Sequence, residues 1–593
     1  MEYEVENLLW DTMALYPSVD SVELERDFSL VDELSDAFRG KYLGKTGGLS
    51  PDSFLEAVTE FEALQERIAK PLAYAQLLFA ADSTSDENKS VSQKASEFAN
   101  LMSRRLLFFD LEIMDIPEEK FLLLCSDERL ANYSHYLTNI RKFRAHTLSE
   151  REEQLLKRKD LTGATAFTRL FDELSASFSY TMTVDGEERD FTGEELLGML
   201  HHPEAELRER AFSTFLLKHE ENGIVLSSVL NNIALDHYNE LELRGYGAPM
   251  DPTNIANEIE SPVVERLMRV SEENYPLARE YFRIKAALLG LPKLKNTDIY
   301  APVGDCGRSY TFAEAKKLVL AAFRGFNPAY GPIIEGFFSE RRIDALPRPG
   351  KGGGAFCMGM TPTLPPYVLM NFTGNLRDVA TLAHELGHGL HFLLSGSQTM
   401  LNYHAPLPLA ETASVFGEML LTRLLLEGET DRGVKTALLC ARIEDIIATT
   451  FRQNVLTRFE ERVHLERKEG LLTSNRICDI WWEENERLYG DSVEMIAPYR
   501  WGWSYISHFI HARFYCYSYV FAELLVLSLF RSYLQEGEGF VPRYEAILKS
   551  GSSRSPADTV RPAGMDPEDP GFWQKGYDLL HDLIKELREL TRL

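Results

Sequence analysis

The chain has 593 residues, of which 44% are hydrophobic and 26% are charged, a composition that supports a sizeable core and excludes wholesale disorder. Its 63 Lys and Arg residues against 91 Asp and Glu residues give a net charge of −28, which argues against nucleic acid and anionic membranes as partners. At roughly 150 residues per domain, the length allows several domains or one large enzyme body with lobes.

Most of the chain has helical periodicity, which predicts a mainly α fold. Residues 1–160 read as successive amphipathic helices, and the helix expected at 22–44 can end at Gly44. Residues 191–223 read as two further helices separated by Pro203. We find no repeat of fixed period.

Cysteine usage and hydropathy predict a cytoplasmic protein. The N-terminal residues are acidic and show no signal peptide, and the longest apolar tracts, such as 524–530, are too short to span a bilayer. Cysteines without any CxxC pair are typical of reduced thiols in a cytosolic protein. The six are Cys125, Cys306, Cys357, Cys440, Cys478 and Cys516.

The segment 345–375 is rich in Gly and Pro and breaks the helical pattern. It contains two short β-like runs, AFCMGM at 355–360 and YVLMNF at 367–372. A small sheet edge beside a catalytic helix can bind an extended peptide through main-chain hydrogen bonds. The alternative is a hairpin that only covers the core.

The sequence HELGH at 384–388 lies in an apolar run that predicts a buried helix, with Asn375 as its cap. At i and i+4, His384 and His388 project from one face about 6 Å apart. This spacing lets both imidazoles reach one tetrahedral Zn²⁺ at roughly 2.0–2.1 Å. Glu385 lies one residue further round, where it can address a metal-bound water.

The alternative is an accidental match on an ordinary helix. Two features argue against it. The flanks are apolar, so unpaired histidines would carry a desolvation cost. Gly387 and Gly389 are poor helix formers, which indicates close approach by a neighbouring element or by substrate.

A catalytic zinc needs a third protein ligand and one open position. No histidine follows at HxxGxxH spacing, and His391 points elsewhere on the helix. Pro408 can open a helix at 409–428 that carries Glu411 in its first turn and Glu418 on the same face. Glu411 is therefore the candidate third ligand, with Glu418 behind it or as the next candidate. The alternative role for Glu411 is compensation of the helix dipole.

The segment 501–525 is dense in Tyr and His. If it is helical, His508, His511 and Tyr515 share one stripe. Tyr O–H and His N–H groups can stabilise the oxyanion that forms during hydrolysis, and a Tyr pKa of about 10 keeps the phenol a donor. The alternative is that an aromatic stripe at this spacing is core packing.

HELGH followed by ETASVFGE resembles the M3 family of zinc peptidases, and within it the oligoendopeptidase F group. Further segments agree over nearly the whole chain, namely WDTMALYPSVDS, GKGGGAFCMG, YVLMNFTGNLRDVATLAHELGH, HFIHARFYCYSY and SGSSRSPADTVRPAGMD. The resemblance implies a helical, two-lobed fold that encloses a deep cleft for short unstructured peptides, and we expect a small sheet beside the HExxH helix. HFIHARF departs from the family pattern, because it carries His511 and no proline before Phe514, where relatives often have a different polar residue and a proline.

By this resemblance, His384, His388 and Glu411 bind one Zn²⁺ per chain and Glu385 is the general base. His and Tyr residues of 505–519 act on the substrate. The catalytic candidates are thus Glu385, His508, Tyr515 and Tyr517, and the candidates for substrate contact are Gly354, Ala355, Phe356 and His511.

We expect residues 1–200 to form a helical lobe that walls the cleft and residues 201–593 to form the catalytic domain. The predicted function is a zinc metalloendopeptidase that cuts internal bonds of short oligopeptides, with no nucleic acid or membrane partner. One alternative is the same chemistry with exopeptidase specificity. Another is a helical peptide-binding scaffold whose metal site is vestigial. The oligomeric state stays open.

Overall fold

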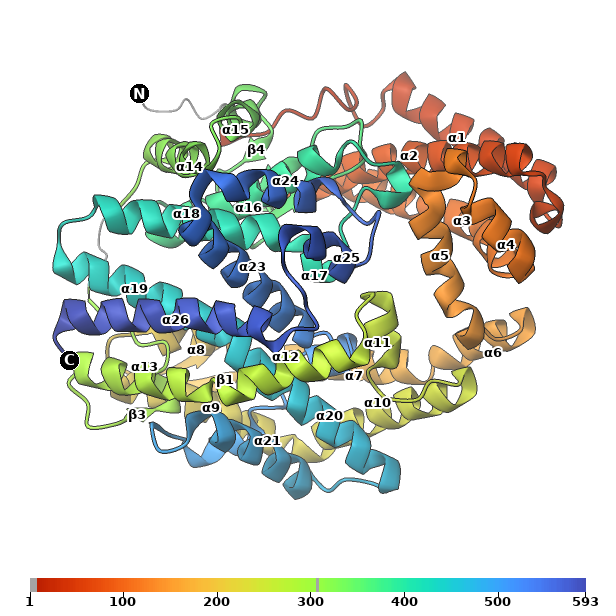
Figure 1. The fold of residues 1–593 in the computed structure, drawn as a ribbon. Coiled ribbons are helices and arrows are strands. Elements are labelled where there is room, and N and C mark those ends of the chain that lie inside the picture. Colours follow the sequence, from red (N-terminus) through yellow and green to blue (C-terminus); the bar gives the residue numbers. More distant parts are fainter. Residues whose placement is uncertain (1–7, 305–308) are drawn as a thin grey trace. The chain divides into compact units, whose positions relative to one another are not determined.

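The computed structural model describes residues 8–304 and 309–593, which are mainly helical with a few short strands (Figure 1). The predicted fold class is confirmed. Five of the six cysteines have free thiols, and Cys306 lies outside the described residues. Among the helices in the described ranges, none is both long and apolar enough to cross a membrane.

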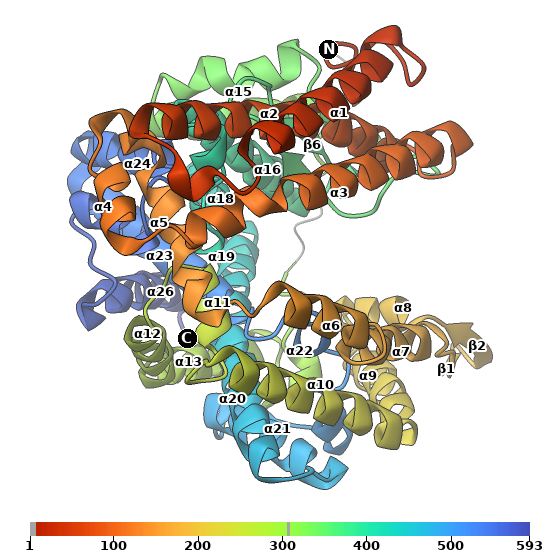
Figure 2. The ribbon, with the colours of Figure 1, turned by 90° about the vertical axis from the view of Figure 1, so that its right-hand side faces the viewer.

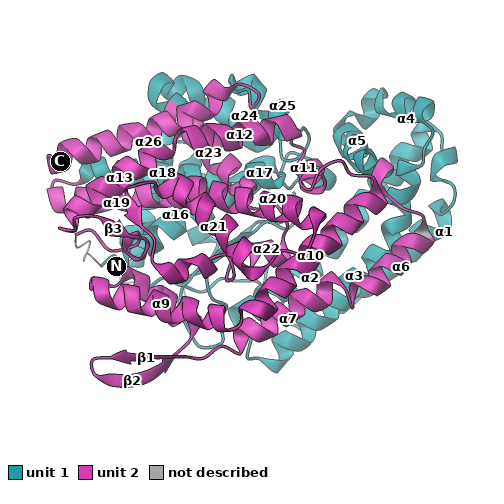
Figure 3. Cartoon of the chain, turned by 90° about the horizontal axis from the view of Figure 1, so that it is seen from below, with its two compact units in different colours: residues 1–144, 307–428, 532–566 teal, residues 145–306, 429–531, 567–593 magenta. Residues whose placement is uncertain are grey.

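The chain divides into two compact units, each built from three stretches (Figure 3). Unit 1, in teal, comprises Met1–Arg144, Gly307–Gly428 and Ser532–Asp566. Unit 2, in magenta, comprises Ala145–Cys306, Glu429–Arg531 and Pro567–Leu593. The sequence analysis divided the chain at residue 200 into a lobe that walls a cleft and a catalytic domain. Both that division and the cleft remain predictions.

Unit 1 begins with three long helices that pack side by side (Figure 2). The first helix ends at Tyr42 and Gly44 follows in the left-handed region with φ +73°, as the sequence predicted. The helices of unit 1 are α1 (Val22–Tyr42), α2 (Pro51–Ala81), α3 (Asp86–Met114), α4 (Glu118–Cys125), α5 (Ser134–Lys142), α14 (Phe312–Phe326), α15 (Tyr330–Ser339), α16 (Leu376–Ser395), α17 (Leu407–Ala410), α18 (Thr412–Gly428), α24 (Val541–Lys549) and α25 (Pro556–Val560).

A three-stranded sheet in unit 1 has the order β4 (Ile343–Asp344), β6 (Tyr367–Leu369), β5 (Phe356–Met358). Strand β4 runs parallel to β6, and β5 runs antiparallel to it at the edge. Both predicted β-like runs are therefore strands. The loop between β4 and β5 is tied down by the buried Asp344, whose carboxylate lies 2.7 Å from both Arg348 Nη1 and Lys351 Nζ.

Unit 2 is a second helical body with two small two-stranded sheets. One is the hairpin β1 (Tyr180–Val184) and β2 (Glu187–Phe191), and the other pairs β3 (Leu294–Lys295) with β7 (Val493–Glu494) in parallel. Its helices are α6 (Glu150–Asp160), α7 (Ala164–Ala176), α8 (Gly193–Gly198), α9 (Ala205–Glu221), α10 (Gly223–Arg244), α11 (Asp251–Ala256), α12 (Ser261–Glu273), α13 (Tyr275–Leu288), α19 (Arg432–Ile447), α20 (Gln453–Glu469), α21 (Ser474–Tyr489), α22 (His508–His511), most of α23 (Tyr517–Glu536), and α26 (Pro570–Thr591).

Candidate metal and catalytic site

Helix α16 begins with the predicted capping box. The Asn375 side chain accepts from the backbone N–H of Asp378 at 2.9 Å. The Asp378 carboxylate in turn accepts from the backbone N–H groups of Thr373 at 2.6 Å and Gly374 at 2.8 Å. These bonds satisfy the backbone N–H of Asp378 in the first turn and two amides of the loop before it, and so they fix where α16 starts.

Glycines let α16 and α18 approach closely. A Cβ at Gly387 would lie 2.4 Å from the carbonyl oxygen of Ala413 and 2.6 Å from Cα of Ser414. A Cβ at Gly389 would lie 2.3 Å from the ring of Phe337. Close approach by a neighbouring element was predicted from these two glycines and is confirmed. Because the contact at Gly387 is backbone to backbone, it sets how near the start of α18 comes to the histidines.

We expect Gly387→Ala to weaken both the fold and the metal site, because the added methyl collides with main chain that cannot rotate away. Overpacking of this kind costs about 1–3 kcal/mol. Thermal unfolding and bound metal should both fall. Gly428→Ala at the far end of α18 is the matched control, since a Cβ there meets nothing within 4 Å. Unchanged stability and metal content in Gly387→Ala would contradict this account of the contact.

Glu411 lies at a break between two helices. The sequence predicted one helix over 409–428 with Glu411 in its first turn, and this was wrong. Helix α17 ends at Ala410, Glu411 has φ −84° and ψ 2°, and α18 starts at Thr412. The Ser414 hydroxyl donates to the Glu411 carbonyl at 3.0 Å and lies 2.6 Å from the Glu411 carboxylate. Such local side-chain bonds compete with the regular helical ladder.

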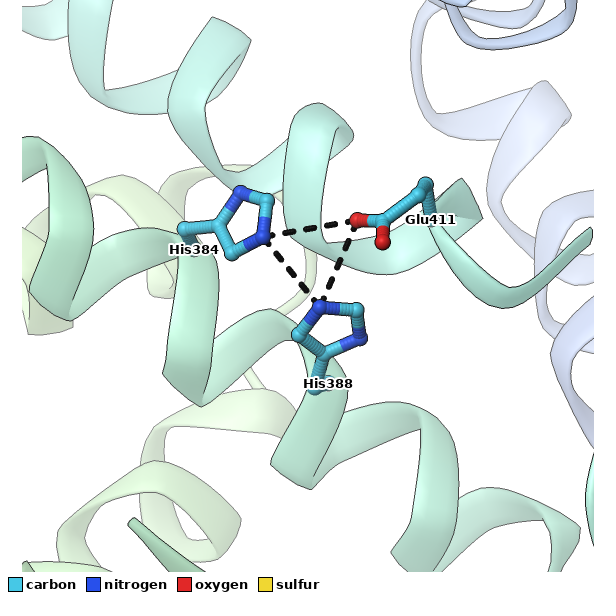
Figure 4. A group of neighbouring side chains, drawn as sticks. All are labelled: His384, His388 and Glu411. Atoms are coloured by element: carbon cyan, nitrogen blue, oxygen red, sulfur yellow. Dashed lines mark hydrogen bonds and ion pairs between the residues drawn. The ribbon is translucent and has the colours of Figure 1, made fainter. Parts of the chain in front are cut away.

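The side chains of His384, His388 and Glu411 converge on one point (Figure 4). The two Nε2 atoms are 3.2 Å apart, and they lie 3.4 Å (His384) and 3.3 Å (His388) from Oε2 of Glu411. Around a tetrahedral ion with bonds of 2.0–2.1 Å, neighbouring ligand atoms lie about 3.3 Å apart. The three edges therefore match the face of such a site, and two imidazoles with one carboxylate are a donor set that zinc accepts.

A second carboxylate orients the first histidine. Nδ1–H of His384 donates to Oε1 of Glu418 at 2.5 Å, which leaves Nε2 facing the other two side chains. Burial alone would lower the pKa of His384, but the hydrogen bond to Glu418 and the charges of Glu418 and Glu411 outweigh it and raise the pKa to about 9. Burial likewise opposes ionisation of Glu411, yet its bond to His388 holds its pKa at about 2. The sequence predicted Glu418 either behind Glu411 or as the next candidate ligand, and in the structure its carboxylate contacts His384.

Glu385 is 5% exposed, and its Oε2 is buried without a hydrogen-bond partner in the described part of the chain. Burial raises its pKa above the usual range. Together with the three converging side chains it lines a cavity of about 400 Å³. A carboxylate without a hydrogen-bond partner, beside three side chains that could hold a metal ion, is suited to exchange a proton with a group that enters the cavity.

The edge strand β5 borders the same cavity. Ala355, Phe356 and Cys357 line it, whereas Gly354 precedes the strand with φ +74° and its carbonyl accepts from the side chain of Asn371. Cys357 was not predicted as a site residue. The alternation of the strand would have indicated it, because Cys357 lies two residues after the candidate Ala355 and so shares its side of the chain, whereas Phe356 contacts both the cavity and the core.

Two further histidines of this cavity were not predicted as site residues. His391 and His404 both line it. Burial lowers the pKa of His391 to about 4, so this ring is neutral near pH 7. Burial likewise lowers the pKa of His404. Neither belongs to the converging triad, and nothing in the local sequence spacing distinguishes His404 from an ordinary loop residue.

The Tyr and His segment, in unit 2, is not one helix. Helix α22 ends at His511 and α23 starts at Tyr517. Between them, Phe514 has φ +54°, a left-handed conformation that is uncommon for an aromatic residue. Its N–H donates to the buried carboxylate of Glu460 at 2.9 Å. The predicted stripe therefore does not exist, because a tertiary contact fixes a turn inside it.

The turn gathers His508, Tyr515 and Tyr519. Nε2 of His508 lies 3.2 Å from the Tyr519 hydroxyl, and the Tyr515 ring lies 5.7 Å from the His508 ring and 5.1 Å from the Tyr519 ring. Tyr517 is buried, and its hydroxyl accepts from Asn257 at 2.9 Å. His511 is exposed and lies 2.9 Å from Asp172. Sequence reasoning missed Tyr519, although the helix that it assumed would have placed Tyr519 on the same face as Tyr515, four residues earlier.

Comparison with known proteins identifies the family of the chain. A profile described as Peptidase family M3 matches residues 198–579, and one described as Oligopeptidase F matches residues 112–180. The chain is 27% identical to oligopeptidase PepF of Bacillus subtilis, with 98% of this chain and 87% of that protein covered. It is also 27% identical to group B oligopeptidase PepB of Streptococcus agalactiae, with 99% and 97% covered.

A solved structure agrees in fold. The crystal structure of oligoendopeptidase-F from Enterococcus faecium superposes with a TM-score of 0.72 at 24% identity and covers 96% of this chain and 99% of that one. The first family profile alone spans more than half of the chain. The chain therefore belongs to peptidase family M3 and is a metallopeptidase, a hydrolase of peptide bonds.

Proposed function

We propose that the protein is a zinc-dependent endopeptidase that cuts internal bonds of short, unstructured oligopeptides, with one Zn²⁺ per chain. The observation that carries this proposal is the convergence of His384, His388 and Glu411 beside the unpartnered carboxylate of Glu385 in one cavity. The relatives named as oligopeptidases and oligoendopeptidase support the substrate class.

In this proposal the two histidines and Glu411 hold the ion, and Glu418 fixes the ring of His384. When bound, Zn²⁺ supplies the Lewis acidity that polarises the scissile carbonyl and activates a water. Glu385 takes the proton from the attacking water and returns it to the leaving amine. Burial of its carboxylate favours proton uptake, since the neutral form of a buried carboxyl costs less to desolvate.

The substrate backbone is proposed to pair with the free edge of β5, where Ala355 and Phe356 line the cavity. Gly354 precedes this edge and gives the loop its turn. His511, which is exposed, is kept as a further candidate for substrate contact. We further propose that residues 1–200 wall a cleft that limits access to flexible peptides, while residues 201–593 carry the chemistry.

The experiment that tests this function is mass spectrometry of the products from a mixed peptide library, with and without chelator and with zinc restored. Peptides blocked at both ends separate the alternatives. An endopeptidase cuts them internally, whereas an exopeptidase leaves them whole. A peptide-binding scaffold releases no products. Full activity in metal-free protein, or rapid cleavage of intact globular proteins, would contradict the proposal.

We expect Tyr515→Phe to lower kcat by about 10²–10³ with little change in KM, because one oxyanion donor is lost. Tyr517→Phe is the matched control, since its hydroxyl is buried against Asn257 and does not belong to the His508 cluster. Zinc content should match the wild type in both variants, and thermal unfolding should match it in Tyr515→Phe, whereas Tyr517→Phe loses a buried hydrogen bond and should unfold somewhat earlier. An unaltered kcat in Tyr515→Phe would leave this tyrosine as a packing residue.

A further inference from the structure

Unit 2 contains a cavity that takes no part in the proposed chemistry. Its volume is about 220 Å³. Much of its wall is apolar, with Leu197, Leu200, Phe212, Phe282 and Leu488 among the side chains that line it. Two of its lining side chains carry a formal charge, Glu444 and Arg452, and the exposed His201 lies at its margin.

The acid in this wall already has its counter-ion. Glu444 forms an ion pair with Lys285, which is completely buried, and also accepts from the hydroxyl of Tyr281. This pair is neutral as a whole. The charge that remains in the cavity wall is therefore the guanidinium of Arg452.

Arg452 donates only to two phenols in the described part of the chain. Its Nη1 lies 2.8 Å from the Tyr300 hydroxyl and its Nη2 lies 3.0 Å from the Tyr505 hydroxyl. No carboxylate of the described residues pairs with it. Arg452 is half-buried, and a cation that is partly withdrawn from water without an anion carries a desolvation cost, so the cavity wall lacks one negative charge.

The hydroxyls of Tyr300 and Tyr505 can each donate a further hydrogen bond. Each hydroxyl oxygen accepts from Arg452, so its O–H must point elsewhere, and neither hydroxyl donates to any acceptor among the residues the structure describes. Tyr499, which also lines the cavity, differs because its hydroxyl donates to Asn485 at 3.1 Å. One cation thus lines this cavity together with two O–H groups that donate to no described residue.

The backbone at this point is also unusual. Arg452 ends a five-residue π-helical segment, Ala448–Arg452, between α19 and α20. Ala448 and Arg452 both line the cavity. Wide turns of this kind are rare and are found frequently at functional sites. Here the wide turn brings the guanidinium into the cavity wall.

We propose that this cavity is a binding site for a small monovalent anion, held by Arg452, Tyr300 and Tyr505. A single uncompensated positive charge matches one negative charge, and the apolar remainder of the wall disfavours multivalent anions because their desolvation cost is larger. The volume holds a halide, or the carboxylate of a small molecule together with water. The site is separate from the proposed peptidase chemistry and does not depend on it.

The test is thermal unfolding of the full chain with its metal, titrated with sodium chloride or with sodium acetate at constant ionic strength. A ligand that binds the native state raises the midpoint continuously with the logarithm of its concentration above Kd. We expect this rise in the wild type and its loss in Arg452→Met. The anion that begins to raise the midpoint at the lower concentration binds more tightly and identifies the source, halide or carboxylate.

Two controls keep the test decisive. Arg458→Met removes a charge six residues away on α20 that already pairs with Glu265 and Glu272, so it should keep the anion effect. If Arg452→Met does not fold, the double variant Tyr300→Phe/Tyr505→Phe should weaken anion binding by about tenfold or more. Tyr499→Phe should not, because its proton already has an acceptor.

A direct readout is the anomalous signal of bromide in crystals soaked in sodium bromide. A peak within contact distance of Arg452, Tyr300 and Tyr505 would support the site. Equal midpoints in every anion for wild type and Arg452→Met, together with no bromide peak in the cavity, would overturn the proposal and show that the cavity holds water alone.

Discussion

Replacing Glu385 with Gln is expected to lower kcat by about 10²–10⁴ or more while the chain keeps its full metal content. The amide has the shape of the carboxylate but cannot take a proton from water. Glu385 does not belong to the converging triad, so its loss leaves the three ligand atoms in place. The measurements are kcat on an internally cleaved peptide and metal per chain by elemental analysis.

The fold should tolerate this change. Oε2 of Glu385 is buried without a partner, and a neutral amide is cheaper to bury than an unpaired carboxylate. Thermal unfolding of Glu385→Gln should therefore match or exceed that of the wild type. Glu427→Gln, at an exposed position of α18, is the control for the substitution itself. Wild-type kcat in Glu385→Gln would remove the general base from the mechanism.

The local part of the site could be predicted from sequence. The positions of His384 and His388 follow from the pitch of one helix, and the capping box at Asn375 follows from hydrogen-bonding chemistry within four residues. Glu411 was identified by a carboxylate in an apolar stretch, which is a statement about burial cost and does not require its backbone conformation. The prediction was therefore right about the grouping and wrong about the helix.

What failed depends on contacts between distant parts of the chain. The turn at Phe514 needs the carboxylate of Glu460, which no pattern within 501–525 contains. As a result, the sequence indicated Tyr517 where the structure groups Tyr519 with His508. His404 enters the cavity through a loop whose path is set by tertiary packing, whereas the alternation of β5 could have indicated Cys357. Periodicity describes faces of elements, and a cavity is formed by several elements at once.

Substitution of the metal-ligand candidates should separate them from Glu385. We expect His384→Ala, His388→Ala and Glu411→Ala to lose bound zinc together with activity, because a catalytic site with three protein ligands cannot spare one. Elemental analysis after dialysis against trace zinc measures the loss of bound zinc. The peptide assay at saturating zinc measures how much activity added zinc can restore.

Glu418 gives the sharpest comparison, because it contacts His384 through Nδ1 and not through the converging Nε2. Glu418→Ala should retain zinc with an affinity lowered about 10–100-fold, since orienting carboxylates of this kind contribute that much. The zinc affinity of Glu411→Ala should fall well below that of Glu418→Ala. If Glu411→Ala instead binds zinc as tightly as the wild type while Glu418→Ala does not, the third ligand is Glu418. The 3.3 and 3.4 Å distances from Glu411 to the histidines would then reflect the packing of α18 against α16 rather than coordination.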